Sequence, residues 1–133
     1  MAMKVIVCLD QNGGMLFNRR RQSRDARVFE DISTYAERLS ASPFSEKLLS
    51  SYGVPHSVDE NFPENAKDGY AFVENIPLLP YEESITEVIV YRWDKIYPAD
   101  TVFDLPLTKY RLISTEEFSG NSHKTIVKET YLV

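Results

Sequence analysis

The chain has 133 residues, of which 43% are hydrophobic and 26% are charged, and its formal net charge is −5. This length suits one core, so residues 1–133 are expected to form a single domain. The apolar runs are far shorter than the roughly 20 residues that span a bilayer, and no signal-peptide pattern is present, which predicts a cytoplasmic protein. The single cysteine, Cys8, is expected to be a small buried side chain.

The first half of the chain predicts one buried strand and two helices. Residues 4–9 read as a strand covered on both faces, because residues 5–9 are continuously apolar, and Gly13-Gly14 ends it. From Ser23, the predicted N-cap, apolar residues follow helical spacing as far as Leu39. A second, short helix is expected after Pro43.

The second half is richer in strand signals. Residues 55–69 are polar and interrupted by proline, so a loop is expected there. Strands are predicted at residues 70–74, 87–93, 110–115 and 125–132, and the prolines within residues 76–80 argue against a full helix. This order favours an α/β sheet that ends in an antiparallel hairpin.

Charge is distributed unevenly. Five of the eight arginines lie between Arg19 and Arg27, whereas residues 59–87 carry eight acids and one lysine. A local cationic patch on an acidic protein favours a compact anion over a long polyanion, so nucleic acid is not the favoured partner. The candidates for binding a phosphate or carboxylate are Arg19, Arg20, Arg21 and Arg24. A solvated loop paired with the acidic middle segment explains the same arginines equally well.

Several segments resemble dihydrofolate reductases. In that family a buried strand precedes a Gly-Asp-Thr-x-Phe-Pro segment and a closing hairpin, and the corresponding segments here are residues 85–92, ADTVFD at 99–104, residues 110–112 and residues 117–123. The strand ending at Asp10, with Met15-Leu16 and Asn18, resembles the family's first strand and its mobile active-site loop. The resemblance implies an α/β three-layer sandwich like a truncated dihydrofolate reductase, with a mainly parallel sheet and an antiparallel C-terminal hairpin.

The same resemblance implies candidate site residues. Asp25, with Phe29 four residues later, resembles the acidic motif of the folate-binding helix, which makes Asp25 the candidate catalytic residue and Phe29 a ligand contact. Asp10 and Asn18 join the arginines as candidate ligand-binding residues. Ordinary structural roles compete with these interpretations, since acids are favoured in the first turn of a helix and strand-end aspartates often cap turns.

Departures from the family pattern argue against the familiar reaction. The phosphate-gripping Gly-Arg-x-Thr is replaced by residues 40–43, SASP, and the cofactor-binding Gly-Gly aligns with Glu74-Asn75. Glu74 would place negative charge against phosphates, and Tyr91 stands where the family has a threonine that supports the catalytic carboxylate. NADPH-dependent reduction of dihydrofolate is therefore not expected, and no cofactor is predicted.

The pattern NGGMLFN…RRRQSRD is also similar to short bacterial proteins that carry the label ribonuclease Z. Such nucleases need a His-rich cluster for two zinc ions, whereas this chain has only His56 and His123, so no metal site is expected. We interpret Asn121-Ser122-His123 as a hairpin turn.

Three functions stay open. The leading hypothesis is a non-reductase protein that binds a small anionic or heterocyclic ligand, or a partner, through the Arg-rich loop. The alternatives are a weak pterin- or nucleotide-dependent reductase and an RNA-acting protein without a zinc cluster.

Overall fold

The computed structural model describes residues 3–59 and 69–133. Its main feature is a seven-stranded sheet of order β5-β4-β6-β1-β7-β10-β9. The strands of this sheet are β1 (Met3–Leu9), β4 (Leu39–Ala41), β5 (Ser57–Val58), β6 (Tyr70–Phe72), β7 (Ile85–Arg92), β9 (Arg111–Phe118) and β10 (Ile126–Leu132). The helices are α1 (Ala26–Tyr35) and α2 (Pro43–Ser51), with 3-10 turns η1 (Leu79–Ser84) and η2 (Leu107–Lys109).

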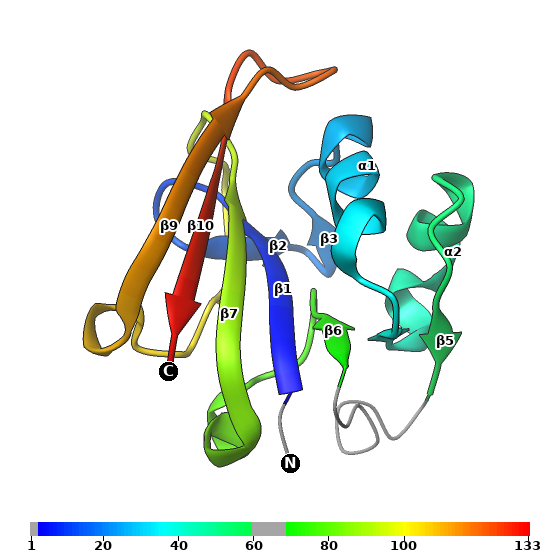
Figure 1. Cartoon of the computed structure of the whole chain (residues 1–133). Coiled ribbons are helices and arrows are strands. Elements are labelled where there is room, and N and C mark those ends of the chain that lie inside the picture. Colours follow the sequence, from blue (N-terminus) through cyan, green and yellow to red (C-terminus); the bar gives the residue numbers. More distant parts are fainter. Residues whose placement is uncertain (1–2, 60–68) are drawn as a thin grey trace.

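Strand direction confirms the mainly parallel sheet with an antiparallel C-terminal hairpin. β1 pairs in parallel with β6 and β7, and β4 pairs in parallel with β5 and β6. β10 runs antiparallel to both β7 and β9. Figure 1 shows β9 at one edge of the sheet and the short strand β5 near the two helices at the other.

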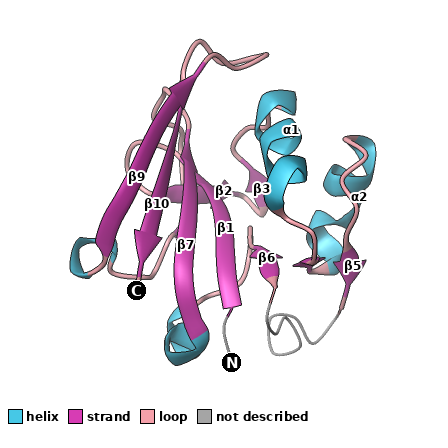
Figure 2. Cartoon of the chain, viewed as in Figure 1, coloured by secondary structure: helices cyan, strands magenta, loops and turns pink. Residues whose placement is uncertain are grey.

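Three layers form around two apolar cores. On one face, Ile6 of β1 and Ile89 of β7 pack with α1 and α2, which lie on the same side of the sheet in Figure 2. On the other face, Val5 and Val88 pack with Leu16 of a second, smaller sheet and with Leu105. The continuous apolar run of β1 is explained by this burial on both faces.

The second sheet was not predicted. It contains β2 (Gly14–Phe17), β3 (Arg20–Arg21) and β8 (Thr101–Val102), in the order β3-β2-β8. Both pairings are antiparallel, with Phe17 opposite Arg20 and Gly14 opposite Val102. The expected Arg-rich loop is therefore largely a β-hairpin that covers one face of the main sheet.

Helix α1 begins later than expected. Its N-cap is Asp25, whose carboxylate accepts from the Arg27 N–H at 2.9 Å, so the prediction of Ser23 as N-cap was wrong. Val28, Phe29 and Ile32 form the buried face, as the helical spacing predicted. The helix ends at Tyr35, and Leu39 begins β4 instead of continuing the helix.

The other predicted helix and strands are present with shifted boundaries, whereas β5 and η2 were not predicted. α2 starts at Pro43, which suits the first helical position because proline has no N–H to donate. The proline-containing segment near residue 80 forms η1 and no α-helix. Within the predicted loop at 55–69, residues 57–58 form β5, and residues 60–68 lie outside the described part. None of the described helices has the length and apolar character needed to cross a membrane.

Candidate ligand-binding site

A tight turn positions the arginines. Asn18 and Arg19 link β2 to β3 and have φ values of 51° and 61°, so both central residues of this two-residue loop are left-handed. Such a turn matches the twist of a hairpin, and asparagine tolerates it better than most residues. The Asn18 N–H donates to Asp100 Oδ2 at 3.1 Å, which attaches the turn to the segment before β8.

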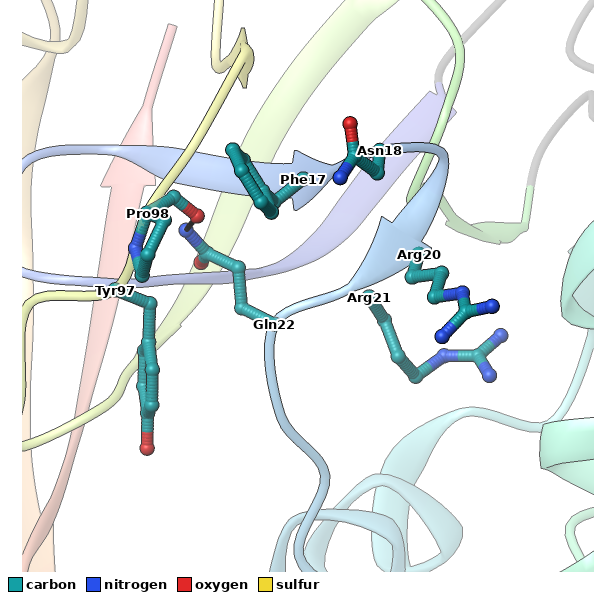
Figure 3. A pocket seen from close by; sticks show the side chains of 7 residues that line it. All are labelled: Phe17, Asn18, Arg20, Arg21, Gln22, Tyr97 and Pro98. Carbon is teal, nitrogen blue, oxygen red and sulfur yellow. Dashed lines mark hydrogen bonds between the residues drawn. The ribbon is translucent and has the colours of Figure 1, made fainter.

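A pocket of about 560 Å³ lies beside this hairpin. Figure 3 shows Tyr97 and Pro98 on one side of it, Arg20 and Arg21 on the other, and Gln22 between them. Phe17 and Asn18 complete the lining. An aromatic face, an amide and guanidinium groups are thus gathered around one hollow, a combination suited to a planar anionic ligand.

Asp10 supports the pocket from behind. Its carboxylate is fully buried and accepts from the main-chain N–H groups of Asn12 and Gly14, both at 2.8 Å. It also accepts from Gln22 Nε2 at 3.0 Å and from the Tyr97 N–H at 3.1 Å, so it holds two residues of the pocket wall. Burial acts to raise the pKa of Asp10, but these hydrogen bonds outweigh it and lower the pKa below its usual value.

Some of the arginine side chains form ion pairs within the protein, and others have no acidic partner among the described residues. Arg21 forms a bidentate pair with Glu74, with N–O distances of 2.8 and 3.0 Å, and lies over the Phe44 ring. Arg27 pairs with Glu30 on the helix surface. Within residues 3–59 and 69–133, the guanidinium of Arg20 has no partner, although it lines the pocket.

The other two predicted arginines lie elsewhere. Arg19 lines a neighbouring hollow of about 460 Å³, together with Phe44, Asn75 and Asp100. Arg24 is exposed and does not line the pocket, and its carbonyl accepts from the Ser122 hydroxyl. Of the predicted ligand contacts, the pocket therefore gathers Asn18, Arg20 and Arg21.

Two segments, residues 40–43 and Glu74-Asn75, align with the phosphate-binding segments of dihydrofolate reductases, and their side chains do not suit a dinucleotide. Glu74 follows β6 and accepts from Ser45 Oγ of α2 at 2.7 Å, so its carboxylate occupies the start of α2, where a phosphate would need donors. The bond from Ser42 Oγ to Asn75 Oδ1 shows that the two departing segments, SASP and Glu74-Asn75, meet in space. Arg21 neutralises Glu74 internally, so neither group is free to bind a cofactor.

Asp25 is buried at the start of α1. It accepts from the N–H groups of Asn121 and Ser122, both at 2.8 Å, and from the His123 ring at 2.9 Å. Burial acts to raise the pKa of Asp25, but these hydrogen bonds and that from Arg27 hold the pKa well below its usual range. The carboxylate is ionised at neutral pH and cannot serve there as a general acid. Any other catalytic role for Asp25 stays a prediction.

Phe29 and other aromatic side chains fill the space between the sheet and its helices. The Phe29 ring is 2% exposed and stacks on Tyr52 at a centroid distance of 4.7 Å. Tyr91 donates to Asp31 at 2.6 Å, so the residue at the family's threonine position serves a different carboxylate from Asp25. The hydroxyls of Tyr91 and Tyr35 also contact each other at 2.7 Å.

Sequence reasoning missed Gln22, Tyr97 and Pro98 as lining residues and placed His123 in a plain turn. Tyr97 and Pro98 lie in an irregular segment after β7, which has no local pattern that marks a site. Their proximity to the hairpin depends on the pairing of β2 with β8. No group of three or more histidine, cysteine or acidic side chains in the part described is arranged to hold a metal ion.

Comparison with known proteins defines the fold class. No protein-family model matches the sequence, and no curated protein matches it. A solved structure of dihydrofolate reductase from Enterococcus faecalis, complexed with NADP(H) and RAB-propyl, matches with a TM-score of 0.70 over 98% of this chain and 95% of that chain. The two sequences are 9% identical. The chain thus has a dihydrofolate reductase-like fold, as its sequence segments suggested.

Proposed function

We propose that this protein binds a small planar anion in the pocket between the β2–β3 hairpin and residues 97–98. The observation that carries the proposal is the guanidinium of Arg20, which lines a 560 Å³ pocket without a protein partner among the described residues. Phe17 is 43% exposed beside it, and Tyr97 provides a second aromatic surface. A ligand carboxylate or phosphate pairs with Arg20 while its ring contacts these side chains.

The proposal excludes the ordinary reductase reaction. Glu74 aligns with a phosphate-binding segment of dihydrofolate reductases and Arg21 already neutralises it, which supports a ligand-binding role without NADPH. The fold is the argument for the alternative, a weak pterin- or nucleotide-dependent reductase. The RNA-acting alternative rests on the arginines alone, of which Arg21 and Arg27 are paired within the chain.

Thermal unfolding with a defined panel tests the proposal. The probes are folate, adenosine monophosphate, pyrophosphate, NADPH and a short single-stranded RNA. A ligand at 100 times its Kd stabilises by about 2.7 kcal/mol, so a probe that fits produces a clear rise in Tm. We expect folate or adenosine monophosphate to stabilise the protein, and pyrophosphate, which has no ring, to do so less.

Two variants locate the binding. Arg20→Ala is expected to weaken binding by at least about tenfold, because it removes a charge-assisted pair. Arg111→Ala, on the far edge strand β9, removes the same charge outside the pocket and is expected to bind as the wild type does. Equal binding by Arg20→Ala and wild type would refute the proposal. Stabilisation by NADPH would support the reductase alternative. Stabilisation by RNA and by no other probe would support the RNA-acting alternative.

A further inference from the structure

Close to the pocket lining, three side chains are joined in series by hydrogen bonds. Ser23 Oγ contacts His123 Nε2 at 2.8 Å, and His123 Nδ1 contacts Asp25 Oδ2 at 2.9 Å. Ser23 and Asp25 flank Arg24 just before α1, and His123 lies in the turn between β9 and β10. This is the order of atoms found in the Ser-His-Asp arrangement of hydrolases with unrelated folds.

The protonation pattern follows from Asp25. Its carboxylate is ionised, because three backbone N–H groups and the His123 ring hold its pKa low, so it acts as an acceptor for the ring. Nδ1 of a neutral His123 must therefore carry the proton, which leaves Nε2 as an acceptor. The Ser23 hydroxyl then donates to Nε2, and this is the state in which a histidine can take the serine proton.

The arrangement is held rigidly. Besides the ring, Asp25 accepts from the N–H of His123 itself at 3.1 Å, so the same carboxylate fixes both backbone and side chain of the histidine. The imidazole stacks on Trp93 with a centroid distance of 4.4 Å and an interplanar angle of 18°. The side chains of Asp25 and His123 are 0% and 3% exposed, so water does not compete for the bond between them.

The serine lies next to residues that line the pocket. Ser23 is partly exposed and directly follows Gln22, which lines the pocket. Tyr97 also lines it, and its hydroxyl lies 3.2 Å from His123 Nε2, the same nitrogen that Ser23 contacts. The Tyr97 O–H is thus a second donor at Nε2. Once Nε2 has taken the serine proton it no longer accepts, and the Tyr97 O–H is then free to donate to the charged oxygen of an acyl group on Ser23.

We infer that Ser23 is the nucleophile of an acyl-transfer activity on small carboxylic esters, with His123 as its base, Asp25 as the positioning residue and Tyr97 as the oxyanion donor. Ser23 Oγ bonds to the acyl carbon while its proton passes to His123 Nε2. The ester bond then breaks and the leaving alcohol takes that proton. Water attacks the acyl-serine and gives a proton to Nε2, which returns it to Ser23 Oγ as the carboxylic acid departs. A preference for anionic esters rests on the proposed function of the pocket.

Labelling by a neutral fluorophosphonate tests the nucleophile without involving the pocket's charge. An activated serine displaces fluoride, so the intact protein gains one phosphonyl group, which peptide mapping assigns to Ser23. We expect labelling in the wild type and in Ser114→Ala, a serine on the exposed strand β9, and none in Ser23→Ala. An unlabelled wild type, or a label on another serine, would overturn the inference.

Ester hydrolysis provides the second readout. Ser23→Ala is expected to lower the rate of 4-nitrophenyl acetate hydrolysis by about 10³-fold or more, while its circular dichroism spectrum stays like that of the wild type. Tyr97→Phe is expected to lower kcat by about 100-fold, while Ser23 is still labelled. Unchanged hydrolysis by Ser23→Ala would overturn the inference. If the anionic ester mono-4-nitrophenyl succinate is hydrolysed faster than the acetate, and Arg20→Ala removes that preference, the result would support anion binding in the pocket. Labelling without this preference would refute the pocket proposal alone.

Discussion

Asp25 joins two parts of the chain through a single carboxylate. It accepts from the Arg27 N–H at the start of α1 and from three consecutive N–H groups of residues 121–123. A buried carboxylate is stable only when its oxygens are paired, and here they are paired by donors that local backbone geometry provides. The same bonds orient the His123 ring, so the helix cap and the proposed positioning role are one arrangement.

The close approach of Gly120 makes this arrangement sensitive to one methyl group. A Cβ at Gly120 would lie 2.6 Å from Asp25 Oδ2 and 2.7 Å from the His123 carbonyl oxygen. We expect Gly120→Ala to destabilise the fold by roughly 1–3 kcal/mol in urea unfolding, because neither neighbour is the end of a flexible chain. Ser119→Ala, next to it and exposed, is the control and should stay within about 0.5 kcal/mol of the wild type. Equal stability of the two variants would contradict the crowding argument.

For single residues, the sequence predicted the place in the secondary structure better than the contacts that each side chain makes. The spacing of Asp25 and Phe29 indicated one helical turn, and both lie at α1. Their surroundings come from distant residues: the bonds from Ser23 and Asp25 to His123 span 100 and 98 positions. A local pattern does not contain such pairings, which is why His123 was interpreted as an ordinary turn residue.

At the scale of the elements, one partly buried ion pair attaches the β2–β3 hairpin to the end of β6. Arg21 and Glu74 have side-chain exposures of 27% and 10%, and their bidentate contact attaches β3 to the region where β6 ends and α2 begins. Arg27 and Glu30 are 52% and 68% exposed, so water screens them much more strongly. The two pairs share chemistry and differ in burial.

This difference yields a matched comparison. Among residues 3–59 and 69–133, Arg21→Ala leaves the Glu74 carboxylate with only Ser45 as a side-chain partner. We therefore expect a loss of roughly 1–3 kcal/mol in urea unfolding. Arg27→Ala should cost about 0.5 kcal/mol or less. A similar loss in both variants would show that burial of the Arg21 pair contributes nothing.

Element prediction succeeded where periodicity was strong. The apolar run of β1 and the spacing in α1 mark their burial, and both elements were expected. The hairpin β2–β3 was missed because its turn, Asn18-Arg19, lacks the glycine that usually marks a left-handed pair, and β3 has only two residues. β8 was missed for a similar reason, since two residues carry no period.

At the scale of the whole molecule, the stability of the fold is expected to depend on acid, because two buried carboxylates, Asp10 and Asp25, each join segments that are distant in the sequence. Hydrogen bonds lower the pKa of both carboxyls in the folded state, against burial. In the unfolded chain an aspartate titrates near pH 3.9. The stabilisation is therefore fully present above about pH 5 and is lost as the pH falls toward the lower folded pKa values.

Urea unfolding midpoints between pH 7 and pH 3 measure this loss. The wild type should lose stability steeply below about pH 4, and Asp25→Asn should be less stable at pH 7 but lose less on acidification. Glu83→Gln removes an exposed carboxylate of η1 and should follow the wild-type profile. Parallel profiles for wild type and Asp25→Asn would contradict the assigned contribution.

The pairing of residue 23 with residue 123 also has a consequence for synthesis on the ribosome. Ser23, α1 and the β2–β3 hairpin emerge early, whereas His123 follows 100 positions later and is placed by strands β9 and β10. A nascent chain that ends after β9 contains six of the seven strands of the main sheet but still lacks His123, the base proposed for Ser23. Fluorophosphonate labelling of arrested nascent chains would thus mark the moment at which the last two strands close onto the first helix.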